Sequence, residues 1–146
     1  MRRLKFFGWL FLVSVVVVID EVIKKNGLKN FPNESFIDDK KIVNLAIHKN
    51  FGIAFDLPVW LPAVTVLTIV IVAALLIYSF KQHRLNTNKA ISLAAVAIGA
   101  LGNLFDRIIY GFTVDYIIIP VTGSAFNLSD VVIIFGIVFL IRKHKK

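Results

Sequence analysis

Cysteine is absent from this sequence of 146 residues, and histidine and acidic residues are few. Without cysteine the chain forms no disulfide bond, no thiolate metal site and no cysteine nucleophile. The three histidines, His48, His83 and His144, lie far apart and form no H-E-x-x-H pattern, so no metal site is predicted. Lysine and arginine outnumber acidic residues by 17 to 9, but they gather between apolar runs and not in a stripe, so no nucleic-acid partner is expected.

Apolar residues, in contrast, make up 58% of the chain, and the mean hydropathy is +0.79. A soluble domain of this size could not cover so much apolar surface, so lipid is the expected solvent. The first apolar run has a basic start but no small-x-small cleavage site, so we expect a retained helix and not a cleaved signal peptide. The sequence predicts an all-α membrane protein, one domain over 1–146, with four transmembrane helices at about 6–23, 59–80, 90–109 and 126–141.

The basic residues predict the orientation of these helices. Because cytoplasmic loops are rich in Lys and Arg, both termini and the loop at 81–89 are expected in the cytoplasm. The connections at 24–57 and 110–125 then face outward, although the first carries six lysines. Within it, residues 41–55 are rich in β-branched side chains and are expected to form one or two short strands on the membrane surface.

Polar residues gather at one end of the third apolar run. Ala95, Gly99 and Asn103 follow one another at i+4, and Asp106 and Arg107 continue that face. Small residues let another helix approach closely, so the polar ones are expected to point into protein and not into lipid. An ionisable group within a membrane is a functional candidate by default, and the alternative is that these residues only cap the helix and pair with neighbours.

Two further carboxylates, Asp115 and Asp130, lie on the predicted outer side. Taken singly, Asp115 is interpreted as a turn residue, and Asp130 as part of a capping box with Asn127 at the start of the fourth helix. Taken together, they lie near the interface, where two carboxylates in a partly dry site tend to share a proton. Such a pair can activate water with one carboxylate and protonate the substrate with the other, as in an aspartic peptidase.

Two other clusters lie on the same predicted side. Asp20 and Lys24 are spaced i,i+4 at the outer end of the first helix, where an ordinary ion pair is the simplest interpretation. Asn50 and Gly52 interrupt the apolar residues of KNFGIAF, where a plain turn is the simplest interpretation.

Four blocks in this order, IDEVIKK, KNFGIAF, GALGNLFDRIIYGFTVDY and FNLSD, resemble the lipoprotein signal peptidase family, also called signal peptidase II. They extend from residue 19 to residue 130, so the resemblance covers most of the chain. It implies an aspartic peptidase in the bacterial cytoplasmic membrane with its active site near the outer face. It also implies cleavage of prolipoprotein signal peptides just before a diacylglyceryl-modified cysteine.

By that resemblance the catalytic pair falls on Asp115 and Asp130, and the outer segment corresponds to a small extracytoplasmic β-cradle. The family is inhibited by globomycin-type cyclic peptides, no cofactor is implied, and membrane lipids and a monomeric state are expected. Supporting polar residues fall on Asp20, Lys24, Asn50, Gly52, Asn103, Arg107 and Asn127.

The chain departs from the family pattern at a few positions. Ser129 stands where Ala is usual, Glu21 where Gln is common, and Phe51 where Thr is usual. We expect Ser129 to hydrogen-bond Asp130 and lower the pKa of that carboxyl. Asn103 and Arg107 are expected to hydrogen-bond the loop that carries Asp115.

Other functions fit parts of the pattern. A small ion or proton carrier would use the clustered aspartates as a relay, but relays usually extend through the full depth of a membrane. A Ser/Lys peptidase would use Ser35, Ser124 or Ser129, but no lysine is expected to be buried beside them. A purely structural four-helix scaffold would leave the clustered carboxylates without a role.

Overall fold

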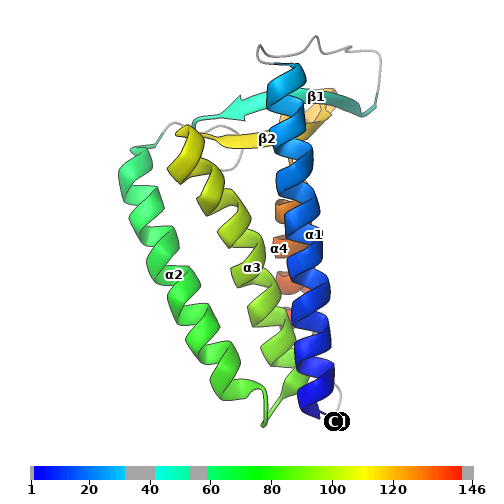
Figure 1. Ribbon diagram of the computed structural model, residues 1–146, viewed down its shortest axis with the longest axis vertical. Helices are drawn as coiled ribbons and strands as arrows, with labels where there is room; N and C mark the ends of the chain where they lie inside the picture. Colours follow the sequence, from blue (N-terminus) through cyan, green and yellow to red (C-terminus); the bar gives the residue numbers. More distant parts are fainter. Residues whose placement is uncertain (1, 32–41, 53–58, 143–146) are drawn as a thin grey trace.

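The computed structural model describes residues 2–31, 42–52 and 59–142. Within these residues four α-helices form a bundle, and a small antiparallel sheet lies across one end of it (Figure 1). Helix α1 begins and α4 ends at the end opposite the sheet. The elements are α1 (Arg2–Asn30), β1 (Asn44–Asn50), α2 (Leu61–Gln82), α3 (Thr87–Tyr110), β2 (Thr113–Ile119), the 3₁₀ helix η2 (Pro120–Thr122), β3 (Ser124–Phe126) and α4 (Leu128–Ile141).

Helix α1 is longer than the apolar run that predicted it. It covers Arg2–Asn30 and not 6–23, so the start of the predicted outer segment at 24–57 is helical. Backbone hydrogen bonding continues past the end of the apolar run, because a helix does not need an apolar side chain at every position. The strand expected within 41–55 is described at Asn44–Asn50. Ser35 and the acidic residues of the outer segment, Glu34, Asp38, Asp39 and Asp56, lie outside the described residues.

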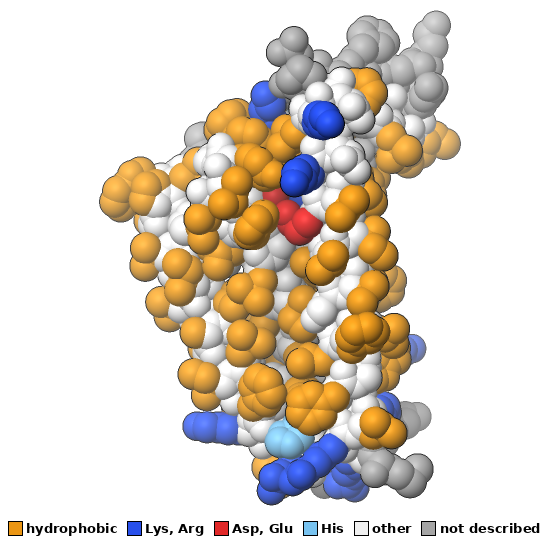
Figure 2. Space-filling view, viewed as in Figure 1, with side chains coloured by type: hydrophobic (Ala, Val, Ile, Leu, Met, Phe, Trp, Pro, Cys, Tyr) orange, Lys and Arg blue, Asp and Glu red, His pale blue; other side chains and the backbone are white. Residues whose placement is uncertain are grey.

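By length and composition, α1, α2 and α3 can each cross a membrane. Helix α4 is apolar but has 14 residues, fewer than the roughly 17 of a spanning helix. Helix α2 begins close to its predicted start, with Pro62 in its first turn. Figure 2 shows apolar side chains over the helices and Lys and Arg near both ends, with the larger group at the end opposite the sheet. These features are those of a multi-pass membrane protein, whereas the four crossings and the sidedness stay predictions.

Helix α3 lies at the centre and packs against α1, α2 and α4. Its face of Ala95, Gly99 and Asn103 is buried, as the small-residue pattern predicted. A Cβ added at Gly99 would lie 2.7 Å from the main-chain oxygen of Ser129, so α4 can approach this closely only because residue 99 has no side chain. Gly111, with φ of 77°, ends the helix and turns the chain into β2.

Strand β2 is the middle strand of the sheet and pairs antiparallel with β1 and β3. The segment at 110–125 was predicted as a short connection, with Asp115 taken singly as a turn residue. That interpretation is wrong, because Asp115 lies within β2, opposite His48 of β1. The β-branched sequence TVDYIII favours a strand. Its partner β1 is distant in the sequence, since 62 residues lie between the paired Asn50 and Thr113.

Candidate active site

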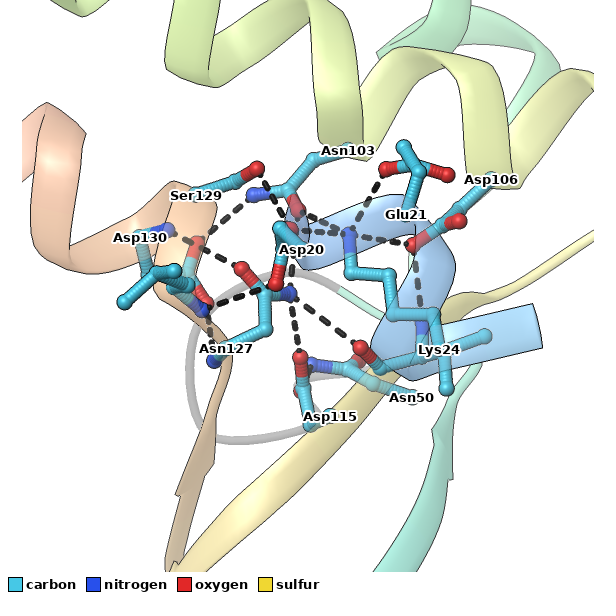
Figure 3. Close-up of polar contacts among 12 residues, drawn as sticks. Asp20, Glu21, Lys24, Asn50, Asn103, Asp106, Asp115, Asn127, Ser129 and Asp130 are labelled. Atoms are coloured by element: carbon cyan, nitrogen blue, oxygen red, sulfur yellow. Dashed lines mark hydrogen bonds and ion pairs between the residues drawn. The ribbon is translucent and has the colours of Figure 1, made fainter. Parts of the chain in front are cut away.

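Polar side chains from five elements converge where the sheet meets the helix bundle (Figure 3). Nearly all of them are buried, although the surrounding helices are apolar. Buried polar groups need hydrogen-bond partners, and here they supply them to one another. The group contains Asp20, Glu21 and Lys24 from α1, Asn50 from β1, Asn103 and Asp106 from α3, Asp115 from β2, and Ser129 and Asp130 from α4, with Asn127 at the N-cap of α4.

Asp115 points from β2 into this cluster and is 1% exposed. Its Oδ2 accepts from Nδ2 of Asn50 at 3.0 Å, and its Oδ1 accepts from Nδ2 of Asn127 at 2.8 Å. Burial raises the pKa of Asp115 to about 7; the Asn50 hydrogen bond acts in the opposite direction, and the charge of Asp130 adds to the rise. Asp115 therefore holds a proton at a pH where an ordinary aspartate is ionised.

Asp130 is held by the start of its own helix. The predicted capping box is present: Asn127 Oδ1 accepts from the Asp130 main-chain N–H at 3.0 Å, and Asp130 Oδ2 accepts from the Asn127 main-chain N–H at 3.1 Å. The other carboxylate oxygen accepts from Nδ2 of Asn103 at 2.6 Å. Both oxygens are thus fixed, one by α4 and one by α3.

Asn127 links the two carboxylates, which we call the carboxylate pair. Its backbone N–H binds Asp130, while its Nδ2 donates to Asp115 at 2.8 Å and to Oδ1 of Asn103 at 3.0 Å. The side chain is completely buried. One residue therefore joins β2, α3 and α4, so the capping role and a role in the site are compatible.

Lys24 is the buried cation of the cluster. Its Nζ lies 2.9 Å from Asp20, 2.8 Å from Asp106 and 3.2 Å from Glu21. It also donates to Oδ1 of Asn103 at 3.4 Å. The predicted ion pair between Asp20 and Lys24 is confirmed, and Asp106 is paired across two helices.

Asp20 joins this cation to the start of α4. It accepts from the hydroxyl of Tyr116 at 2.7 Å, from the N–H of Leu128 at 3.0 Å and from Oγ of Ser129 at 2.6 Å. The prediction that Ser129 binds Asp130 is therefore wrong, because its hydroxyl points back to α1. Burial, reinforced by the hydrogen bond to Asp20, raises the pKa of Tyr116, so its hydroxyl stays protonated and donates.

Comparison with known proteins places the chain among peptidases. Residues 12–144 match the family described as Signal peptidase (SPase) II. The chain belongs to the signal peptidase II family. The lipoprotein signal peptidase of Enterobacter sp. (strain 638) is 35% identical over 91% of this chain and 85% of its own length. That of Buchnera aphidicola subsp. Schizaphis graminum is 28% identical over 99% of this chain and 97% of its own length.

Two solved structures support the same assignment. Both are described as a bacterial membrane enzyme, and both are 26% identical to this chain. The alignment with the first has a TM-score of 0.73 and covers 95% of this chain and 94% of the solved chain. The alignment with the second has a TM-score of 0.74 and covers 94% of this chain and 95% of the solved chain. With its apolar helices, this member of the signal peptidase II family is a multi-pass bacterial membrane protease.

Arg107 and Gly52 contribute in different ways. The N–H of Gly52 donates to Oδ1 of Asn50 at 2.9 Å, so this turn orients the amide that binds Asp115. Neither Asn103 nor Arg107 forms a side-chain hydrogen bond with β2 among the described residues, contrary to expectation: Asn103 binds Asp130 and Asn127, and the buried Nε of Arg107 has no partner there. Its charge nevertheless interacts with the carboxylate pair.

The sequence patterns missed one member of this polar cluster, Tyr116, and the pairing of two others. Tyr116 follows Asp115 directly but contacts a residue 96 positions earlier, which no local pattern predicts. Asp106 was singled out on α3, but not its pairing with Lys24. The i,i+3 spacing of Glu21 and Lys24 is a signal that could have identified their ion pair. Among the described residues, no group of His, Cys, Asp and Glu is arranged to hold a metal ion.

Proposed function

We propose that this protein is an aspartic endopeptidase that removes the signal peptide from diacylglyceryl-modified prolipoproteins, with the carboxylate pair as the catalytic dyad. The observation that carries the proposal is the carboxylate pair itself, the buried Asp115 and the partly buried Asp130, both of which Asn127 binds through hydrogen bonds. Such a pair tends to retain one proton between its members, and a pKa of about 7 for Asp115 agrees with that.

The chemistry follows from one shared proton. The ionised carboxylate takes a proton from a water molecule, whose oxygen then attacks the carbonyl carbon of the scissile peptide bond. The protonated carboxyl donates its proton to the carbonyl oxygen. As the C–N bond breaks, the carboxyl that took the proton from water delivers it to the nitrogen, and the carbonyl oxygen returns its proton to the other carboxylate. Asn50, Asn103 and Asn127 orient the two carboxylates for these transfers, and Lys24 holds the surrounding charges in place.

The setting of the site fits a lipid-modified substrate. The pair lies where the sheet meets the helix bundle, and apolar side chains such as Leu45 and Val121 of the sheet region are exposed. A cysteine that carries acyl chains would stay at such an interface. The basic residues at the opposite end favour the cytoplasm for both termini, which supports a site near the outer face of the cytoplasmic membrane. Globomycin-type cyclic peptides are expected to bind at the carboxylate pair, and the chain to act as a monomer.

A gel-shift assay in detergent tests the proposal. Wild type should cleave a prolipoprotein whose cysteine carries diacylglycerol, and should not cleave the unmodified form. Asp115→Asn and Asp130→Asn should abolish cleavage while the protein still accumulates in the membrane, and Ser124→Ala should cleave normally. Near-normal activity in either aspartate variant would remove the mechanism. An inactive wild type that transports ions in vesicles would favour the carrier instead.

A further inference from the structure

An apolar groove lies between α1, α3 and α4, in the half of the bundle away from the sheet. It has a cavity volume of about 470 Å³. Trp9 and Val13 of α1 line it on one side and Val132 of α4 on another, while Lys5 and Asn88 lie at its rim. A cavity between helices is a usual place for a small apolar ligand.

A polar cavity of about 310 Å³ adjoins the groove, since Lys5 and Asn88 line both, and Arg2 adds a second cation there. Lys5 Nζ donates to Oδ1 of Asn88 at 3.1 Å, and an ammonium has three donors, so it can bind an anion as well. None of the described residues that line either cavity is acidic. The sequence has no Asp or Glu at 2–19, 81–105 or 131–146, and Figure 2 shows the basic side chains gathered at this end.

We propose that the groove and its basic rim bind one anionic phospholipid, with an acyl chain in the groove and the phosphate at Lys5 and Arg2. The basic rim favours an anionic headgroup, because basic side chains at a membrane surface attract anionic lipids. From Lys5 to Val13 the groove extends about 12 Å along α1, close to the ~15 Å depth of one leaflet. The site lies in the leaflet away from the sheet and does not depend on the peptidase activity.

Other occupants fit less well. The positively charged start of a signal peptide would be repelled by Arg2 and Lys5. Acyl chains of a substrate held near Asp20 would enter the groove from its Val13 end, seven residues or about 10 Å away along α1, and would place no phosphate at the basic rim around Lys5.

Trp9 provides a reporter inside the groove. In a Trp60→Phe background it is the sole tryptophan of the chain. The full-length protein is placed in phosphatidylcholine vesicles. One sample contains a fixed mole fraction of brominated phosphatidylglycerol, and the other contains the same mole fraction of brominated phosphatidylcholine. Bromine quenches tryptophan fluorescence on contact. We expect brominated phosphatidylglycerol to quench Trp9 more strongly than brominated phosphatidylcholine. Each cationic side chain at the site should raise the association constant for phosphatidylglycerol, relative to that for phosphatidylcholine, about fivefold.

Matched variants separate a specific site from general attraction. Lys5→Gln should lower the preference for phosphatidylglycerol about fivefold, whereas Arg3→Gln, which removes the same charge outside the two cavities, should change it little. Val13→Phe should reduce quenching by filling the groove, and Val18→Phe, at an exposed position, should not. Equal quenching by the two lipids, or equal effects of Lys5→Gln and Arg3→Gln, would overturn the proposal.

Discussion

Replacing Asn50 by alanine removes one of the two described side-chain donors to the Asp115 carboxylate, the other being Asn127. The lost bond is 3.0 Å long and fully buried, and a hydrogen bond to a charged group contributes about 1.5–3 kcal/mol. Because this bond stabilises the ionised form, its loss raises the pKa of Asp115 further above about 7. At about 1.4 kcal/mol for each pKa unit, the expected rise is about one to two units.

The pH profile of cleavage measures this rise. The shared proton is bound below the pKa and lost above it, so wild-type kcat/KM should fall as the pH increases through about 7. In Asn50→Ala this alkaline limb should move to higher pH by about one to two units, even where the maximum rate is lower. Leu45→Ala, an exposed position on the same strand, should keep the wild-type limb. A limb in Asn50→Ala at the wild-type pH or below it would refute the reasoning.

Three other substitutions test buried charge and packing. Lys24→Met leaves two buried carboxylates without their cation, and it should lower the unfolding free energy by about 3–5 kcal/mol; an unchanged Tm in detergent would contradict this. Gly99→Leu should lower Tm because α4 must move away, whereas Gly8→Leu, with no atom nearby, should not. Ser129→Ala should lose about 1.5–3 kcal/mol of stability with its bond to Asp20 but retain cleavage, and an inactive variant with wild-type Tm would assign Ser129 to the chemistry.

Several features could be predicted from short stretches because their causes are local. Apolar runs located the four helices, although α1 extends well past its run at both ends. The capping box of Asn127 and Asp130 and the ion pair of Asp20 with Lys24 depend on residues three or four positions apart. Family resemblance, carried by blocks along most of the chain, predicted Asp115 and Asp130 as the candidate carboxylates.

Neighbouring residues and matched blocks were thus enough to predict the helical segments, the capping box at the start of α4 and the family of this protein. Which polar side chains meet depends on the tertiary structure. Asp115 became a buried strand residue because β1 pairs with β2. Ser129 binds Asp20 of α1 and not its neighbour Asp130, and Lys24 reaches Asp106 of α3. Those choices depend on how closely three helices and a sheet pack, because hydrogen bonds and ion pairs form only over a few ångströms.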